Sequence, residues 1–179
     1  MEIPSRFAIP ESLSFEAAIE LTQSLLSEVE QGHILEPELE RIITALVQTE
    51  NGARGFFVTY LSDEREWMDK ITAHVVSGLL PAQDKVADLL TKNLAMSTAM
   101  IITHTRNQKL ELVEGSAIVQ RRTNALIRHM RSRDVDRRLM ELKTSIAQKG
   151  EYSSFLDRWK YDADQRHAIS RAVTDALLN

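Results

Sequence analysis

The 179-residue sequence contains no cysteine, four prolines and six glycines, and its apolar stretches are interrupted by polar residues before they reach membrane-spanning length. The absence of cysteine excludes disulfides, thiolate nucleophiles and thiolate metal sites, and it fits a reducing compartment. The sequence also has no Gly-x-Ser-x-Gly elbow and no phosphate-binding glycine loop. We therefore expect a cytoplasmic, non-enzymatic protein with no membrane segment and no cofactor.

Apolar residues recur at helical spacing through most of the chain. Val135, Leu139, Leu142 and Ile146 lie four, three and four residues apart, a seam typical of paired helices. The aromatic run over residues 55–61 resembles a strand in composition, but no second segment could pair with it, so we assign it to a helix. The pattern predicts one all-α domain over residues 14–179, a bundle of about seven or eight helices, with an irregular arm over residues 1–13 packed on it.

Residues 82–107 are expected to form the buried central helix of this bundle. They are apolar or small on nearly every face, and their charged residues gather at the two ends. Asn93, Ser97 and His104 form a polar line along one side of this helix, where a ligand pocket between helices could use them. The alternative is that neighbouring backbone or water satisfies them. The polar stretch over residues 107–115 is predicted as a loop or a ragged helix end.

Charge is distributed unevenly around a net value of −4. Residues 1–50 contain ten acidic and two basic residues, whereas residues 106–143 contain ten basic and five acidic residues. The basic segment, with two tyrosines from a later aromatic helix, forms the predicted interaction surface. Its members are Arg121, Arg122, Arg128, Arg131, Arg137, Arg138, Tyr152 and Tyr161. In that aromatic helix, Phe155 and Trp159 are expected to pack inward. The arginines could instead meet nucleic-acid phosphates, but acidic residues interrupt them and no known nucleic-acid-binding motif accompanies them.

The segment over residues 73–78, Ala-His-Val-Val-Ser-Gly, resembles the helix that carries the phosphorylated histidine in histidine phosphotransfer domains. The resemblance implies that His74 is a phosphoacceptor and that Gly78, four residues later, admits a response regulator. The chain departs from the pattern at Ser77, where that family has a lysine. Gly78 also has a local explanation, since it could end a helix three residues before Pro81.

Metal binding has weak support in the sequence. A helical di-iron site needs Glu-x-x-His on two helices with further inward carboxylates. The nearest fragments are Glu30 with His33, which straddles a predicted helix end, and Asp164 with His167, in a first helical turn. No two histidines lie four residues apart, and single histidines do not indicate haem. We expect no metal site.

Taken together, these features favour a helical interaction, scaffold or regulatory protein that acts through protein–protein contacts. The partner could be another protein or a second copy of the chain, because the 135–146 seam and the opposed charges suit association. A small-molecule-binding or nucleic-acid-binding regulatory domain is the alternative. A histidine phosphotransfer protein is a more remote one.

Overall fold

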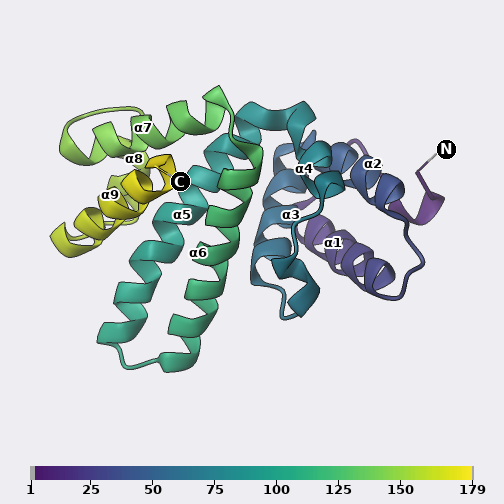
Figure 1. The fold of residues 1–179 in the computed structure, drawn as a ribbon, viewed down its shortest axis with the longest axis horizontal. Helices are drawn as coiled ribbons and strands as arrows, with labels where there is room; N and C mark the ends of the chain where they lie inside the picture. The colour runs from purple at the N-terminus through teal and green to yellow at the C-terminus, as the bar shows by residue number, and fades with distance from the viewer. Residues whose placement is uncertain (1–2, 179) are drawn as a thin grey trace. The chain divides into compact units, whose positions relative to one another are not determined.

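The computed structural model describes residues 3–178 and confirms the all-α fold (Figure 1). Met1, Glu2 and Asn179, which belong to the predicted arm and domain, lie outside the described residues. The α-helices of the described part are α1 (Phe15–Glu30), α2 (Glu36–Val47), α3 (Glu50–Ser62), α4 (Ala73–Leu79), α5 (Gln83–Arg106), α6 (Leu110–Met130), α7 (Arg133–Ala147), α8 (Ser153–Arg158) and α9 (Ala163–Leu178). Short 3-10 turns occupy Ser5–Phe7, Glu66–Asp69 and Leu80–Ala82.

The chain divides into two compact units, and the boundary falls between Val86 and Ala87. The first unit contains α1 to α4. The second contains most of α5, together with α6 to α9. The predicted central helix over residues 82–107 corresponds to α5, and its buried residues include Leu90, Leu94 and Ala99.

In the first unit, α1 packs against α3 at a close crossing. The Ser14 hydroxyl caps α1 by accepting from the backbone N–H of Ala17 over 3.1 Å, and Thr49 caps α3 through the N–H of Gly52. Gly55 lies where α3 meets Ala18 of α1, and a Cβ on that glycine would come within 2.4 Å of the Cβ of Ala18. The two helices can approach this closely because position 55 has no side chain. The aromatic run over residues 55–61 thus lies in a largely buried helix, as assigned, although its composition resembles that of a strand.

In the second helix pair of this unit, α2 and α4, Gly78 does not end a helix as the sequence suggested. The helix continues through this residue to Leu79, and Leu80 is its C-cap, so Gly78 does not end it. A Cβ at Gly78 would lie 2.9 Å from the carbonyl oxygen of Glu40 and from Ile43 on α2. The glycine therefore permits close helix packing.

In the second unit, α5 and α6 run antiparallel side by side and are joined by residues 107–109 (Figure 1). Gln108 turns the chain with a φ of 55°. The prediction of a loop up to residue 115 is wrong, because α6 begins at Leu110. We refer to α5 and α6 as the hairpin. In Figure 1 its turn end extends away from α7.

The 135–146 seam belongs to the interior of the second unit. Val135, Leu139 and Leu142 are buried, and α7 packs against α9 and α8. The seam that the sequence suggested for association is therefore used within the chain. In the N-terminal segment, Phe7 and Leu13 are buried.

Candidate interaction surface

The turn end of the hairpin is its least covered part. We call residues 100–121 the hairpin tip. None of these residues is fully buried, although nine of them are apolar. Leu110 is 76% exposed and Leu112 is 47% exposed. The apolar residues of the hairpin tip are Met100, Ile101, Ile102, Leu110, Leu112, Val113, Ala117, Ile118 and Val119. Leu110 and Leu112 are exposed, and the other seven apolar residues of the hairpin tip are half-buried. Large apolar side chains exposed near one another can mark contact sites.

Polar contacts hold the hairpin in a defined shape. Within the hairpin, the Gln120 amide donates to the Thr98 hydroxyl over 2.7 Å. From α9, the Gln165 amide donates to the carbonyl of Ala99 over 3.2 Å and to the Thr103 hydroxyl over 2.9 Å. Because these bonds fix α5 to both neighbours, the hairpin tip is a preorganised surface.

A charged clamp joins the end of α5 to the start of α9. The Arg106 guanidinium donates to the carboxylates of Asp162 and Asp164. Asp162 is also the N-cap of α9, since it accepts from the backbone N–H of Gln165 over 2.9 Å. That backbone hydrogen bond and the Arg106 guanidinium hold the pKa of Asp162 below its usual range.

The polar line predicted as a pocket lies on α5 but mostly bonds to its own helix. The Asn93 amide donates to the Leu89 carbonyl over 2.9 Å, and the Ser97 hydroxyl donates to the Asn93 carbonyl over 2.7 Å. Ser97 is buried, whereas Asn93 and His104 are half-buried. The groove that α5 helps to form is lined by Thr98 instead, so a pocket along the three residues stays a prediction.

That groove has a volume of about 520 Å³ and lies along α9. Its walls come from α5, α6 and one face of α9: Thr98, Gln120, Ala168, Ser170, Arg171, Ala172, Thr174 and Asp175. The Thr98 hydroxyl already donates to the Leu94 carbonyl and accepts from Gln120. Its polar lining on α5 and α6 is thus engaged within the protein.

The predicted arginine surface does not form a single exposed face. Arg122 is only 4% exposed. On α7, Arg137 forms ion pairs with Asp134 and Glu141, and Arg138 also pairs with Glu141. The remaining three, Arg121, Arg128 and Arg131, are exposed on α6 and at its end. The acids of α7 therefore pair with the arginines of that helix, and the exposed arginines outside α7 are those of α6 and its end.

The two tyrosines assigned to this surface are buried, which corrects the prediction. The exposed fraction is 2% for Tyr152 and 8% for Tyr161, whereas Trp159, expected to face inward, is 49% exposed. The Tyr152 hydroxyl donates to a carboxylate oxygen of Asp88 over 2.8 Å. Burial raises the pKa of both tyrosines above the usual range, and the Asp88 carboxylate adds to the effect at Tyr152.

His74 faces acidic residues of α2. Its Nδ1 lies 2.7 Å from a carboxylate oxygen of Glu40, and its Nε2 lies 3.6 Å from one of Glu36. A phosphoryl group on either nitrogen would meet negative charge, and α2 covers the position of Gly78. This geometry gives no support to phosphotransfer. Among the described residues, no three His, Asp or Glu side chains are arranged to hold a metal ion.

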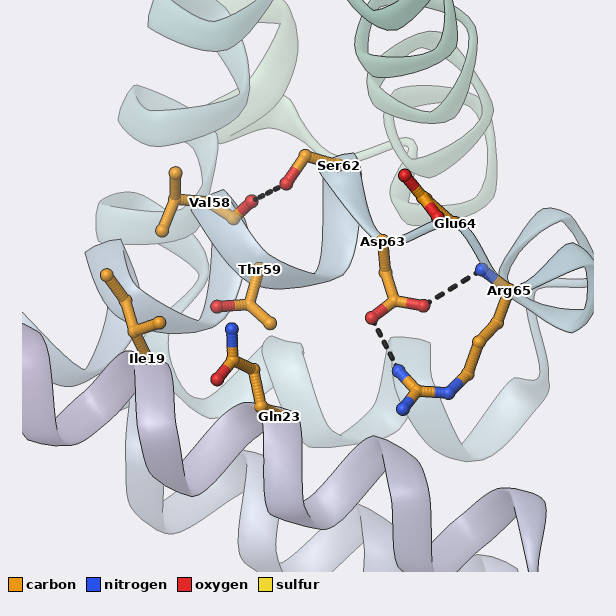
Figure 2. Close-up of a pocket in the computed structure, with 8 residues that line it drawn as sticks. All are labelled: Ile19, Gln23, Val58, Thr59, Ser62, Asp63, Glu64 and Arg65. Carbon is orange, nitrogen blue, oxygen red and sulfur yellow. Dashed lines mark hydrogen bonds and ion pairs between the residues drawn. The ribbon is translucent and has the colours of Figure 1, made fainter.

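A second groove, of about 580 Å³, lies between α1 and α3 (Figure 2). Asp63 accepts from both the backbone and the guanidinium of Arg65, which also pairs with Glu30. Figure 2 shows Gln23 of α1 opposite Thr59 of α3. The Thr59 hydroxyl is buried and has no hydrogen-bond partner among the described residues. Because the charges of Asp63 and Arg65 are paired, the groove offers little to anchor a charged ligand.

Sequence reasoning missed the hairpin tip. The polar residues over 107–115 suggested a loop. The start of α6, where Leu110, Leu112 and Val113 alternate with acids, was therefore not recognised as helical. Two signals were present. His104 and Arg106 are the basic residues that favour a helix C-terminus, so a helix end before Gln108 and Lys109 could be expected. Glu111 is the acidic residue that favours a helix N-terminus shortly after them. With those signals, a helix from residue 110 could have been predicted.

The described residues form an all-α protein whose α5–α6 hairpin exposes Leu110 and Leu112 near its turn. The chain belongs to the family described as Uncharacterised conserved protein UCP020893, whose model matches residues 14–176. No curated protein and no solved structure matches the chain. Within residues 3–178, no helix combines the length and the apolarity that crossing a bilayer requires.

Proposed function

We propose that this protein is a non-enzymatic helical interaction protein, with the hairpin tip as its docking element. The observation that carries the proposal is that no residue over 100–121 is fully buried, although nine of these residues are apolar and Leu110 and Leu112 are 76% and 47% exposed. Two helices alone cannot bury such side chains from water, and a helical partner would do so. The lack of cysteine suits action in a reducing compartment such as the cytoplasm.

Site-specific photo-cross-linking tests this proposal. A photoreactive residue replaces Leu112 in the hairpin tip, and a control protein carries it at Met140 on α7. The two positions are matched, because Leu112 is 47% exposed and Met140 is 50% exposed. In the cells that express the protein, we expect a discrete protein adduct at position 112 and none at position 140. Mass spectrometry of the adduct identifies the partner.

A binding measurement with purified components then tests the contact itself. We expect Leu112→Glu to weaken binding of the identified partner by tenfold or more, since it places a charge in an apolar contact, and Met140→Glu to leave binding unchanged. Both variants must retain the helical circular-dichroism signal. Equal adducts at both positions, or no adduct at either, contradict the proposal.

A further inference from the structure

The groove between α1 and α3 contains a buried hydroxyl that the protein itself does not use. Thr59 of α3 is one of the residues that line this groove, and it is only 7% exposed. Its Oγ1 is shielded from water and has no hydrogen-bond partner among the described residues. A buried polar group without a partner costs free energy, so its presence beside a groove calls for a physical reason.

Other buried threonines show how a helix normally satisfies such a hydroxyl. Three of them donate over 2.7 Å to the carbonyl four residues earlier in the same helix: Thr22, Thr98 and Thr123. Thr59 lies in a helix as well, but its hydroxyl does not bond to the carbonyl of Gly55. Thr91 on α5 is also without a partner among the described residues, but it is fully enclosed and lines neither of the two grooves described above. Thr59 thus combines an unused hydroxyl with a place in the wall of a groove.

Gln23 of α1 supplies a second polar group on the opposite wall. Figure 2 shows its side chain directed toward Thr59. Gln23 is exposed, and its amide forms no hydrogen bond with the described residues. Because no polar contact holds this side chain, it can turn aside to admit a ligand to the hydroxyl. Its amide then offers both a donor and an acceptor.

The rest of the lining favours an uncharged ligand with an apolar part. Ile19 is half-buried and Val58 is 45% exposed, so both present apolar surface to the groove. Asp63 and Arg65 neutralise each other, whereas Glu64 at the exposed rim forms no ion pair with the described residues and disfavours an anion. The volume of about 580 Å³ is within the range of about 300–1,000 Å³ that is usual for small-molecule sites.

We propose that the α1–α3 groove binds a small uncharged molecule that carries an amide or another carbonyl group beside an apolar body. The Thr59 hydroxyl donates to the carbonyl oxygen of the ligand, and the Gln23 amide bonds to the same polar group. Ile19 and Val58 contact the apolar body. This site lies in the first unit and the hairpin tip in the second, so the inference goes beyond the proposed function and each is tested separately.

An NMR titration of the full chain tests the site with three probes that share one aromatic ring. Benzamide is uncharged, benzoate is an anion and benzylamine is a cation. We expect benzamide to give saturable shifts, with a dissociation constant in the millimolar range, at the backbone amides of residues 19–23 and 58–62, and the two ions to bind more weakly. No saturable shift with benzamide at these residues overturns the inference. Equal or stronger binding of either ion overturns the assignment to uncharged ligands.

Two threonine-to-valine variants separate ligand binding from stability. Thr59→Val and its matched control Thr91→Val each replace an unpartnered buried hydroxyl with a methyl group, so we expect both to raise the urea midpoint. Only Thr59→Val should weaken benzamide binding, by about fivefold, because one neutral hydrogen bond to the probe is lost. Thr59→Ser keeps the hydroxyl and should bind benzamide like the wild type.

Three results of this comparison overturn the inference. The first is a Thr59→Val variant that binds benzamide like the wild type, and the second is an equal loss of binding in Thr91→Val. The third is a lower urea midpoint for Thr59→Val, which would mean that the hydroxyl already has a partner in the folded protein.

Discussion

Gln165 and Thr103 connect the start of α9 to the last turns of α5: the Gln165 amide nitrogen donates to the Thr103 hydroxyl over 2.9 Å. The other end of the same amide accepts from the backbone N–H of Asp162 over 3.0 Å, which completes a reciprocal cap of α9. Gln165 is 91% buried, so its polar atoms have little access to water. One side chain thus both caps a helix and fixes the angle of the hairpin.

We expect Gln165→Leu to lower the free energy of unfolding by about 1–3 kcal/mol, because it removes the cap contact to the Asp162 N–H and both hydrogen bonds to α5. Urea denaturation followed by circular dichroism measures the change. Gln148→Leu serves as the control, since the Gln148 side chain is exposed in the same unit. A loss no larger than that of the control would show that the amide contributes nothing.

Local rules predicted much of the fold. The Ser14 and Asp162 caps, and the core positions of α7, follow from side-chain chemistry within one helical turn. Gly78 was misassigned because its role depends on α2, which is distant in sequence. A glycine that permits helix contact and one that ends a helix look the same in a single sequence.

The candidate site was harder to predict than the fold, because exposure depends on which helices cover which faces. Phe155 and Trp159 were paired by their spacing, yet α8 ends at Arg158 and Trp159 lies beyond it. Conversely, the spacing of Leu89, Met96 and Met100 was visible in the sequence, but buried residues surround them on the same helix. Whether such residues are buried depends on the elements packed around α5, which the spacing alone does not give.

Acidic pH should weaken the clamp at the start of α9. The pKa of Asp162 is held low by the Gln165 backbone hydrogen bond and by Arg106, whereas in the unfolded chain it is about 3.9. The stabilisation is therefore complete above about pH 4 and is lost as the pH falls through the lower, folded-state pKa. We expect Asp162→Asn to flatten the dependence of the urea midpoint on pH below about 4. Glu151→Gln, at an exposed position, is the control, and an unchanged profile for Asp162→Asn contradicts the assignment.

Alkaline pH should act on the buried tyrosines. Burial raises the pKa of Tyr152 and of Tyr161, so at pH above about 10 an unfolded tyrosine loses its proton while the folded one retains it. Stability contributed by these residues is complete below pH 10 and declines as the pH rises further. In an absorbance titration, we expect their ionisation to coincide with loss of the circular-dichroism signal. Ionisation at normal pKa with the fold intact would contradict this.

Removing the Tyr152 hydroxyl isolates its bond to Asp88. We expect Tyr152→Phe to cost about 1 kcal/mol at neutral pH, because the ring still fills the core while the 2.8 Å hydrogen bond is lost. Lys92 still pairs with Asp88, so the carboxylate is not left without a partner. The same variant should show a shallower loss of stability above pH 10. Denaturation at pH 7 and pH 11 distinguishes the two effects, and a full alkaline loss in Tyr152→Phe would assign it to Tyr161.

Two glycines in helices should respond to alanine in opposite directions. Alanine is intrinsically favoured over glycine in a helix by about 1 kcal/mol. At Gly115 on α6 a Cβ would meet nothing within 4 Å, so we expect Gly115→Ala to stabilise the protein by about 0.5–1 kcal/mol. At Gly55 the Cβ would lie 2.4 Å from that of Ala18, so α1 and α3 must separate and we expect a net loss of about 1–3 kcal/mol. Thermal and urea denaturation of the two variants measure these changes. Stabilisation by Gly55→Ala would show that the α1–α3 crossing is looser than its geometry indicates.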